Sequence, residues 1–273
     1  EQGEVSKSFN VYKQLCEVLL EKNFHRDDRV IALGGGVVGD LAGFAAATYM
    51  RGIEFINIPS TTLAQIDSSI GGKTAINLNG TKNIIGAFHQ PALVLIDTDL
   101  LASLPERQVN NGLVEALKAG LIGDKALYEL FATGDIRENR DEIIRRAILV
   151  KKDVVEKDEK EQSLRKVLNF GHTLGHGLES VCGIPHGEAV AIGMLPMIED
   201  SVLRSAVKQI INEKLAINTE INCDKELVMQ EITKDKKAAT DSVTVVKVKT
   251  AGHAELQKAS LDDCRQYLNR MGI

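Results

Sequence analysis

Apolar side chains recur along the first hundred residues with two different spacings. The segments FNVYKQLCEVLLEKN, residues 9–23, and GDLAGFAAATYM, residues 39–50, carry them at helical spacing. Short apolar runs rich in β-branched residues, RVIAL at 29–33, EFINIPST at 54–61 and ALVLID at 92–97, are typical of buried strands. Strands that alternate with helices in this way predict an α/β layer built on a parallel sheet.

The pattern changes after about residue 100, where helical periodicity takes over. It begins with SLPERQVNNGLVEALKAGLI at 103–122, continues through residues 141–161 and extends to about residue 232. A strand pattern returns only in SVTVVKVKT at 242–250. We therefore predict two domains, an α/β domain over residues 1–101 and a mostly α-helical domain over residues 102–273.

Composition narrows the functional class. Of the 273 residues, 44% are hydrophobic, which is enough for a sizeable core, and the formal net charge is −5. A nucleic-acid-binding protein usually shows a basic face, so no nucleic-acid partner is expected. The longest apolar stretch, residues 29–50, is interrupted by glycines and by Asp40, so no membrane association is expected either.

The four cysteines, Cys16, Cys182, Cys223 and Cys264, are far apart in the sequence and form no CxxC pair. The first residues show no leader pattern of basic residues followed by an apolar run. Together these features predict reduced thiols in a cytoplasmic protein.

Three glycines follow the first predicted strand at the spacing G-x-G-x-x-G. Gly34, Gly36 and Gly39 lie between that strand and a helix, where backbone N–H groups and the start of the helix favour a pyrophosphate. The neighbouring Asp40 is suited to accept a hydrogen bond from a ribose hydroxyl. By itself the motif fits a simple tight turn between strand and helix equally well.

Three of the six histidines fall close together, in NFGHTLGH and PHGE. His172 and His176 are four residues apart and share one helix face, and His186 follows a Gly-Ile-Pro turn that can return it to the helix end. Zinc sites commonly combine two histidines with one carboxylate, which Glu115 offers on a predicted helix. A single histidine is more often a core residue, whereas this cluster favours a metal or catalytic role.

Basic and polar residues form a third group near the predicted glycine turns and loops. Each one alone is compatible with a solvated surface, but together they predict a pocket for a phosphate and a carboxylate. The group consists of Arg51, Asp67, Lys73, Lys82, Asn83, Lys151, Arg165 and Lys236.

Six long blocks occur in order over nearly the whole chain: ALGGGVVGDLAGFAAATYMRG, IPSTTLAQIDSSIGGKTAIN, KNIIGAFHQP, LVEALKAGLI, LRKVLNFGHTLGH and HGEAVAIGM. Together they resemble the 3-dehydroquinate synthase family of the sugar-phosphate cyclase superfamily. The resemblance implies a carbon–oxygen lyase of the shikimate pathway, which serves aromatic amino acid biosynthesis. Such an enzyme converts 3-deoxy-D-arabino-heptulosonate 7-phosphate to 3-dehydroquinate and phosphate, with NAD and a divalent metal, zinc or cobalt.

The implied reaction proceeds through transient oxidation by NAD, elimination of phosphate, re-reduction and an intramolecular aldol closure. The implied fold joins an N-terminal Rossmann-like NAD domain to a mostly α-helical, metal-binding C-terminal domain, and the implied assembly is a homodimer. In the family another βαβ-sized segment precedes the block that EQGEVSKS resembles, so the N-terminal domain is expected to lack its first βαβ segment.

Carried over position by position, the resemblance implies four groups of site residues. The metal ligands are Glu115, His172 and His186, and the acid/base residues are His176 and Glu161. The substrate-contacting positions are Arg51, Asp67, Lys73, Lys82, Asn83, Asn111, Lys118, Lys151, Arg165, Asn169 and Lys236, with Lys237 as the alternative to Lys236. The NAD-contacting positions are Glu4, Lys7, Gly35, Gly36, Asp40, Ser60 and Thr61.

Three alternatives stay open. The chain could be another sugar-phosphate cyclase, which would share the first steps of the reaction. It could be a metal-dependent polyol dehydrogenase, although the predicted phosphate-binding lysines argue against net NADH formation. It could also be a metal- or nucleotide-binding module without activity, against which the complete set of polar site residues argues.

Overall fold

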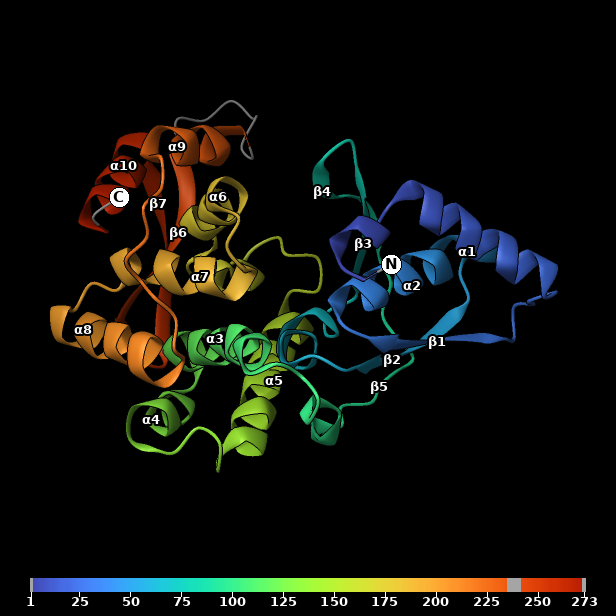
Figure 1. Ribbon diagram of the computed structural model, residues 1–273, viewed down its shortest axis with the longest axis horizontal. Coiled ribbons are helices and arrows are strands. Elements are labelled where there is room, and N and C mark those ends of the chain that lie inside the picture. The colour runs from blue at the N-terminus through green and yellow to red at the C-terminus, as the bar shows by residue number, and fades with distance from the viewer. Residues whose placement is uncertain (1, 235–241, 272–273) are drawn as a thin grey trace. The chain divides into compact units, whose positions relative to one another are not determined.

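The computed structural model describes residues 2–234 and 242–271 and divides the chain into two compact units, Glu1–Val109 and Asn110–Ile273 (Figure 1). The boundary falls within the first turn of helix α3 (Glu106–Gly123), a few residues after the predicted one at 101. Among the described residues, no helix is both long and apolar enough to cross a bilayer.

The first unit contains a three-stranded parallel sheet with the strand order β1-β2-β5. Its helices and strands are α1 (Phe9–Glu21), β1 (Arg29–Gly34), α2 (Gly36–Thr48), β2 (Glu54–Pro59), β3 (Lys73–Leu78), β4 (Thr81–Phe88) and β5 (Leu93–Val94). The α/β layer predicted from the alternating pattern is thus present. The third predicted strand is shorter than its apolar run, because only two of its residues pair with β2.

One face of this sheet packs against α2. Ala32 and Phe55 point from the strands into a core that contains Ala42 and Ala46 of the helix. On either side of Ala32 in β1, the side chains of Ile31 and Leu33 point to the other face of the sheet and are 62% and 60% exposed. Because successive side chains of a strand point to opposite faces, the apolar run RVIAL supplies both a buried and an exposed face here.

The hairpin of β3 and β4 was missed by the sequence analysis, which treated this segment as loops between strands. The two strands are antiparallel and are joined by Asn79 and Gly80, whose φ angles are 49° and 78°. Two successive residues with positive φ are typical of the tight turn that Asn-Gly forms between strands. The dipeptide Asn-Gly was therefore the available signal for this hairpin.

The second unit is mostly helical, as predicted, and adds one antiparallel hairpin. Besides α3, its elements are α4 (Lys125–Thr133), α5 (Arg140–Lys157), α6 (His172–Cys182), α7 (His186–Met194), α8 (Ser201–Gln209), α9 (Lys225–Lys234), β6 (Ser242–Thr250), β7 (His253–Ser260) and α10 (Leu261–Arg270). Helix α3 is buried continuously from Asn111 to Ile122, so its polar side chains there face other protein groups instead of water.

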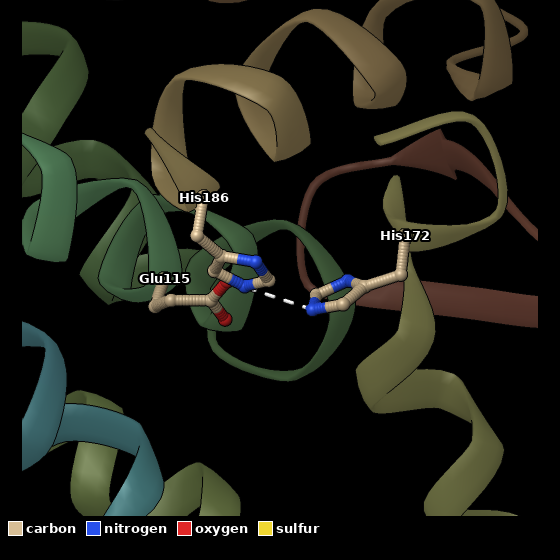
Figure 2. A group of neighbouring side chains, drawn as sticks. All are labelled: Glu115, His172 and His186. Atoms are coloured by element: carbon tan, nitrogen blue, oxygen red, sulfur yellow. Dashed lines mark ion pairs between the residues drawn. The ribbon is translucent and has the colours of Figure 1, made fainter. Parts of the chain in front are cut away.

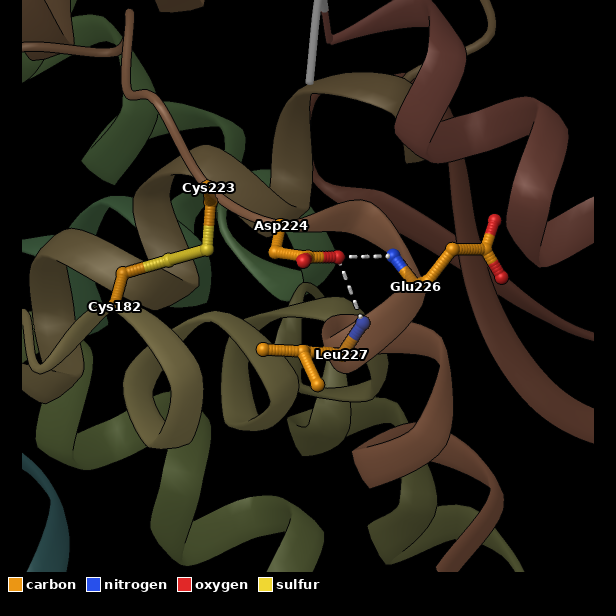
Figure 3. Close-up of a disulfide and its surroundings, with 5 residues drawn as sticks. All are labelled: Cys182, Cys223, Asp224, Glu226 and Leu227. Carbon is orange, nitrogen blue, oxygen red and sulfur yellow. Dashed lines mark hydrogen bonds between the residues drawn. A yellow bond between two sulfur atoms is a disulfide. The ribbon is translucent and has the colours of Figure 1, made fainter.

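The prediction that all four cysteines are reduced is wrong for one pair. Cys182 and Cys223 form a disulfide with Cα atoms 6.0 Å apart, and it links the end of α6 to the residue before Asp224 (Figure 3). The Asp224 side chain then caps α9 by accepting the backbone N–H of Glu226 and of Leu227. Cysteines separated by 41 residues give no pairing signal in the sequence, because only the packing of α6 beside α9 brings them together.

Candidate active site

Glu115, His172 and His186 converge from three helices of the second unit (Figure 2). Their potential ligand atoms lie within 4.8 Å of one another. The Glu115 Oε1 atom is 3.8 Å from His172 Nε2 and 3.5 Å from His186 Nε2. These three residues are the metal ligands that the family resemblance implies, and the fold brings them together.

This group suits a divalent cation. Both carboxylate oxygens of Glu115 are buried; Lys118 Nζ forms an ion pair with Oε2, and the two histidine rings lie beside Oε1. Burial opposes ionisation of Glu115, but Lys118 and the two histidines outweigh burial and hold its pKa well below the usual range. Two imidazoles and an ionised carboxylate are a donor set that zinc and similar cations prefer.

The second ring nitrogen of each ligand histidine is also engaged. His186 Nδ1 lies 2.9 Å from Glu179 Oε2, and His172 Nδ1 lies 3.1 Å from the carbonyl oxygen of Phe170. Such outer contacts fix the tautomer of a ligand histidine and turn its Nε2 toward the metal. The sequence analysis missed Glu179, which follows His172 and His176 on the same face of α6 at helical spacing.

The two ligand histidines respond differently to this environment. Burial and then Lys118 hold the pKa of His172 well below its usual value, so its ring is neutral and ready to bind a cation. Burial also opposes protonation of His186, but hydrogen bonds to Glu115 and Glu179 outweigh it and raise the pKa of His186 to about 10. A divalent cation therefore competes with a proton at His186.

His176 lies one helical turn after His172 and contacts both ligand histidines. Its ring centroid is 5.2 Å from that of His172 and 6.0 Å from that of His186. It is not part of the three-residue group, which is the one metal-binding arrangement found among the described residues. This placement supports its predicted role beside the metal as an acid/base residue.

Backbone geometry places His186 at the first turn of α7. Asn111 Oδ1 accepts the backbone N–H of Gly187 at 2.7 Å and that of Glu188 at 3.3 Å, so Asn111 caps this helix. A Cβ at Gly187 would lie 1.9 Å from the Asn111 carbonyl oxygen, so only glycine fits at this position. Asn111, predicted as a substrate contact, thus holds the helix that carries the predicted metal ligand His186.

The segment that follows α5 is organised by Asp158. Its carboxylate accepts the backbone N–H groups of Gln162, Ser163 and Arg165. The bonds from Arg165 and Ser163 contribute most and lower the pKa of Asp158 to about 2. Asp158 thereby shapes the loop that contains Glu161, the second predicted acid/base residue.

Within that loop, Glu161 and Asn169 are direct neighbours. Asn169 Nδ2 donates to Glu161 Oε1 at 2.7 Å, and Glu161 has a left-handed φ of 57°. The guanidinium of Arg165 donates to the Glu159 carbonyl and is buried. The structure therefore brings together three residues that were predicted separately as acid/base and substrate-binding groups.

Two further predicted substrate contacts, Lys118 and Lys151, are buried in the second unit. Lys118 lies one turn after Glu115 on α3, and Lys151 lies on α5. Buried lysines need a nearby charge or hydrogen-bond partner, which Glu115 provides for Lys118. Lys236 and its alternative Lys237 lie outside the described residues.

The glycine-rich turn of the first unit has the predicted strand–turn–helix form. Strand β1 ends at Gly34, Gly35 precedes the first residue of α2, and Gly36 begins the helix. The backbone N–H of Ser60 donates to the Gly34 carbonyl at 2.8 Å, and a Cβ at Gly35 would lie 3.1 Å from Thr61 Cγ2. The predicted NAD contacts at Gly35, Gly36, Ser60 and Thr61 therefore lie along the ends of two adjacent parallel strands.

The other predicted NAD contacts are Glu4, Lys7 and Asp40, and Lys7 forms ion pairs with the other two. Lys7 Nζ is 2.7 Å from Asp40 Oδ2 and 3.2 Å from Glu4 Oε1, and Lys7 is only 4% exposed. Burial raises the pKa of Asp40, and the charge of Lys7 opposes this shift. Asp67 is close enough to Asp40 to raise that pKa slightly further.

The predicted cationic residues of the first unit are exposed and are not gathered at one point of the hairpin. Lys73 begins β3 opposite Phe88, whereas Lys82 lies beside the turn. The two ends of β3, at Lys73 and at Leu78 before the turn, are five residue steps apart, which is roughly 16 Å along a strand. Arg51 lies outside the hairpin and has a left-handed φ of 70°.

Comparison with known families decides the assignment. A family model described as "3-dehydroquinate synthase N-terminal" matches residues 1–111, and one described as "3-dehydroquinate synthase C-terminal" matches residues 112–238. The chain belongs to the 3-dehydroquinate synthase family. A 3-dehydroquinate synthase of Clostridium perfringens is 43% identical over 95% of this chain and 79% of the relative. One from Thermoanaerobacter pseudethanolicus is 43% identical over 97% of this chain and 80% of the relative.

Two sugar-phosphate cyclases are among the solved structures with a similar fold. A 2-deoxy-scyllo-inosose synthase complexed with carbaglucose-6-phosphate, NAD+ and Co2+ has a TM-score of 0.87 and 26% identity, over 99% of this chain and 81% of that one. A 2-epi-5-epi-valiolone synthase from Streptomyces hygroscopicus, with NAD+ and Zn2+ bound, has a TM-score of 0.88 and 25% identity over 100% of this chain and 81% of that one. The 3-dehydroquinate synthase family member described here therefore has the sugar-phosphate cyclase fold.

Proposed function

We propose that this chain converts 3-deoxy-D-arabino-heptulosonate 7-phosphate to 3-dehydroquinate and phosphate, as a carbon–oxygen lyase that uses NAD and a divalent metal. The observation that carries the proposal is 43% identity to 3-dehydroquinate synthases over nearly the whole chain. The convergence of Glu115, His172 and His186 supports it, because the reaction needs a metal-binding group. We further propose that the enzyme is a homodimer and that its first unit is the Rossmann-like NAD domain.

The metal and the cofactor each have suitable residues. Glu115, His172 and His186 would hold the cation, and the backbone of Gly35 and Gly36 would receive the pyrophosphate of NAD. When bound, NAD supplies a reversible hydride acceptor and the cation supplies a Lewis acid at the substrate hydroxyls. The buried charge of Glu115 is already in place for this purpose, which limits the reorganisation that binding requires.

Two residues of the second unit are suited to move protons. His176 would exchange protons with substrate hydroxyls, because an imidazole can be acid or base near neutral pH. Glu161 would serve a second hydroxyl, held in place by its hydrogen bond from Asn169. Both roles depend on a fixed distance to the substrate, which the ring contacts of His176 and the loop around Asp158 would provide.

The cationic and polar residues would bind the ends of the substrate. Arg51, Lys73, Lys82 and Asn83 of the first unit would contact the substrate, and the adjacent Lys82 and Asn83 would bind the phosphate and stabilise its negative charge as it leaves. The remaining substrate contacts would come from Asp67, Asn111, Lys118, Lys151, Arg165, Asn169 and Lys236.

Phosphate release is the test of this function. The chain would be incubated with the sugar phosphate, NAD and zinc while phosphate and NADH absorbance are followed in the same cuvette. Stoichiometric phosphate without accumulation of NADH is the expected result, because the hydride returns to the substrate. No phosphate release from this substrate by metal-loaded protein would overturn the proposal.

A second candidate is another sugar-phosphate cyclase, which the TM-scores of 0.87 and 0.88 favour. The lower identity of those proteins, 26% and 25%, makes this the weaker candidate. Phosphate release from a different sugar phosphate, and none from the heptulosonate, would select it. Steady NADH accumulation with a polyol would instead select a metal-dependent dehydrogenase.

A further inference from the structure

Asn77 lies at an irregularity of the β3–β4 hairpin. Between the paired positions on either side of it, β3 contributes Asn77 alone, whereas β4 contributes Lys82, Asn83 and Ile84. The extra residues form a bulge in which Asn83 has a left-handed φ of 55°. Bulges commonly turn side chains toward an active site, and two residues of this one belong to the proposed phosphate-binding group.

The side chain of Asn77 uses both of its functional groups. Its Oδ1 accepts the backbone N–H of Asn83 at 2.8 Å, and its Nδ2 donates to Glu4 Oε1 at 2.8 Å. Its backbone N–H donates to the Lys7 carbonyl at 2.8 Å. A carboxamide is suited to this position because it offers a donor and an acceptor a short distance apart.

The contact with Glu4 continues to the glycine-rich turn. Glu4 pairs with Lys7, and Lys7 pairs with Asp40 on α2. Because Lys7 is almost fully buried, water screens these contacts weakly. An unbroken series of polar contacts therefore runs from the bulge at Asn83 to Asp40 within the first unit.

We propose that Asn77 is a positioning residue that serves both proposed ligands of the first unit. Its Oδ1 holds the bulge that presents Lys82 and Asn83 to the sugar phosphate, and its Nδ2 holds Glu4 on the cofactor side. This assignment rests on the proposed function. No local pattern identifies Asn77, because Glu4 is 73 residues away in the sequence and Asn83 reaches Asn77 only through the bulge of the folded hairpin.

Two substitutions separate the two hydrogen bonds. Asn77→Asp keeps an acceptor for Asn83 but places a carboxylate against Glu4, so we expect the dissociation constant for NAD to rise roughly 10-fold. The KM for the heptulosonate phosphate should stay within about twofold, because the bulge keeps its hydrogen bond. Asn77→Ala removes both hydrogen bonds, so the dissociation constant for NAD and the KM should each rise by roughly 10-fold.

The matched control is Asn79→Gly in the turn of the same hairpin. Asn79 has a φ of 49°, which glycine adopts readily, so this variant should leave both constants unchanged. All variants are measured as full-length, zinc-loaded protein, with the melting temperature as a check on folding. NAD binding is measured by calorimetry and KM from phosphate release.

The inference depends on whether the NAD dissociation constant and the KM for the sugar phosphate change separately or together. Equal losses of NAD affinity and KM in Asn77→Asp, with a parallel fall in melting temperature, would show a merely structural role and overturn it. Unchanged constants in Asn77→Ala would overturn it as well. If the unmodified protein releases no phosphate, the proposed function fails; an unchanged NAD dissociation constant in Asn77→Asp would overturn the inference independently.

Discussion

The candidate metal ligands of the second unit and the candidate phosphate contacts of the first unit are held in contrasting ways. In the second unit, Glu115 is 1% exposed and is carried with its histidine partners on regular helices. In the first unit, Arg51, Lys73 and Lys82 are exposed and lie at strand ends or beside turns. The buried group has large pKa shifts and fixed outer contacts, whereas exposed cations are screened by water and salt.

This contrast indicates that the two units have different roles in ligand binding. The metal group is organised before any ligand arrives, because its charges are buried and cannot be satisfied by solvent. We expect the exposed cations of the first unit to gain order from the anion that they would bind. Substitutions in the second unit should therefore affect metal content and turnover most strongly, and substitutions in the first unit should affect affinity.

The largest effect is expected from His172→Ala. Loss of a group that hydrogen-bonds to a metal ligand typically lowers metal affinity by roughly 10- to 100-fold. Removal of the ligand itself should lower zinc affinity by more than this, and activity should disappear with the metal. Zinc content after dialysis and phosphate release check this together. Normal zinc occupancy with full activity would exclude His172 as a ligand.

Next in size is His176→Ala, which tests whether the third histidine acts on protons. We expect turnover to fall roughly 10²- to 10⁴-fold, the usual contribution of a general acid or base, while zinc content stays normal. Turnover and bound zinc are measured on the same preparation. Loss of zinc from this variant would instead make His176 a ligand.

Glu179→Gln should have an intermediate effect on the metal. Glutamine keeps the size of the side chain but removes the negative charge that orients and polarises His186, so zinc affinity should fall roughly 10- to 100-fold. Competition with a chelator measures it, and Glu156→Gln on the exposed surface of α5 is the control. Equal zinc affinity in the two variants would contradict this role.

The smallest effect is expected from Asp158→Asn, and it depends on pH. The folded pKa of about 2 lies below the ordinary value of 3.8, so the ionised carboxylate stabilises the fold above about pH 4. That contribution is lost as the pH falls toward 2. The variant should therefore lose less stability between pH 5 and 3 than the unmodified protein in urea unfolding, with Asp141→Asn as the control.

Much of the fold could be predicted from local patterns. Strand β1, the glycine turn and helix α2 follow from apolar spacing and turn chemistry, and so do α1, α5 and β6. The hairpin of β3 and β4 was not predicted although Asn79 and Gly80 signalled it, because lysine, asparagine and glycine residues interrupt its apolar positions and obscure the strand pattern. For β5 the predicted strand was too long, because only Leu93 and Val94 pair with β2. Apolar character predicts burial better than it predicts how many residues pair with a neighbouring strand.

The candidate site was partly predictable for a similar reason. His172 and His176 share a helix face at a spacing of four, which any helix imposes. Glu115 was a candidate because it offers a carboxylate on a predicted helix, the resemblance then implied it as a ligand, and only the packing of α3 with α6 and α7 places it beside the histidines. The Asn111 cap and the Cys182–Cys223 disulfide were not recognised, because their contacts join residues that no local pattern relates. Glu179 was not recognised either, although helical spacing places it on the face of His172 and His176.

By itself the sequence determined the local elements of this protein, the chemical identity of its site residues and its family, because these depend on neighbouring residues and on long matching blocks. Only the tertiary structure decided which polar groups meet. It placed Glu115 between two histidines, bound Lys7 to Asp40 and gave Asn77 its two partners. The physical reason is that hydrogen bonds and ion pairs act over a few ångströms, so a partner distant in the chain is selected by the packing of whole helices and strands.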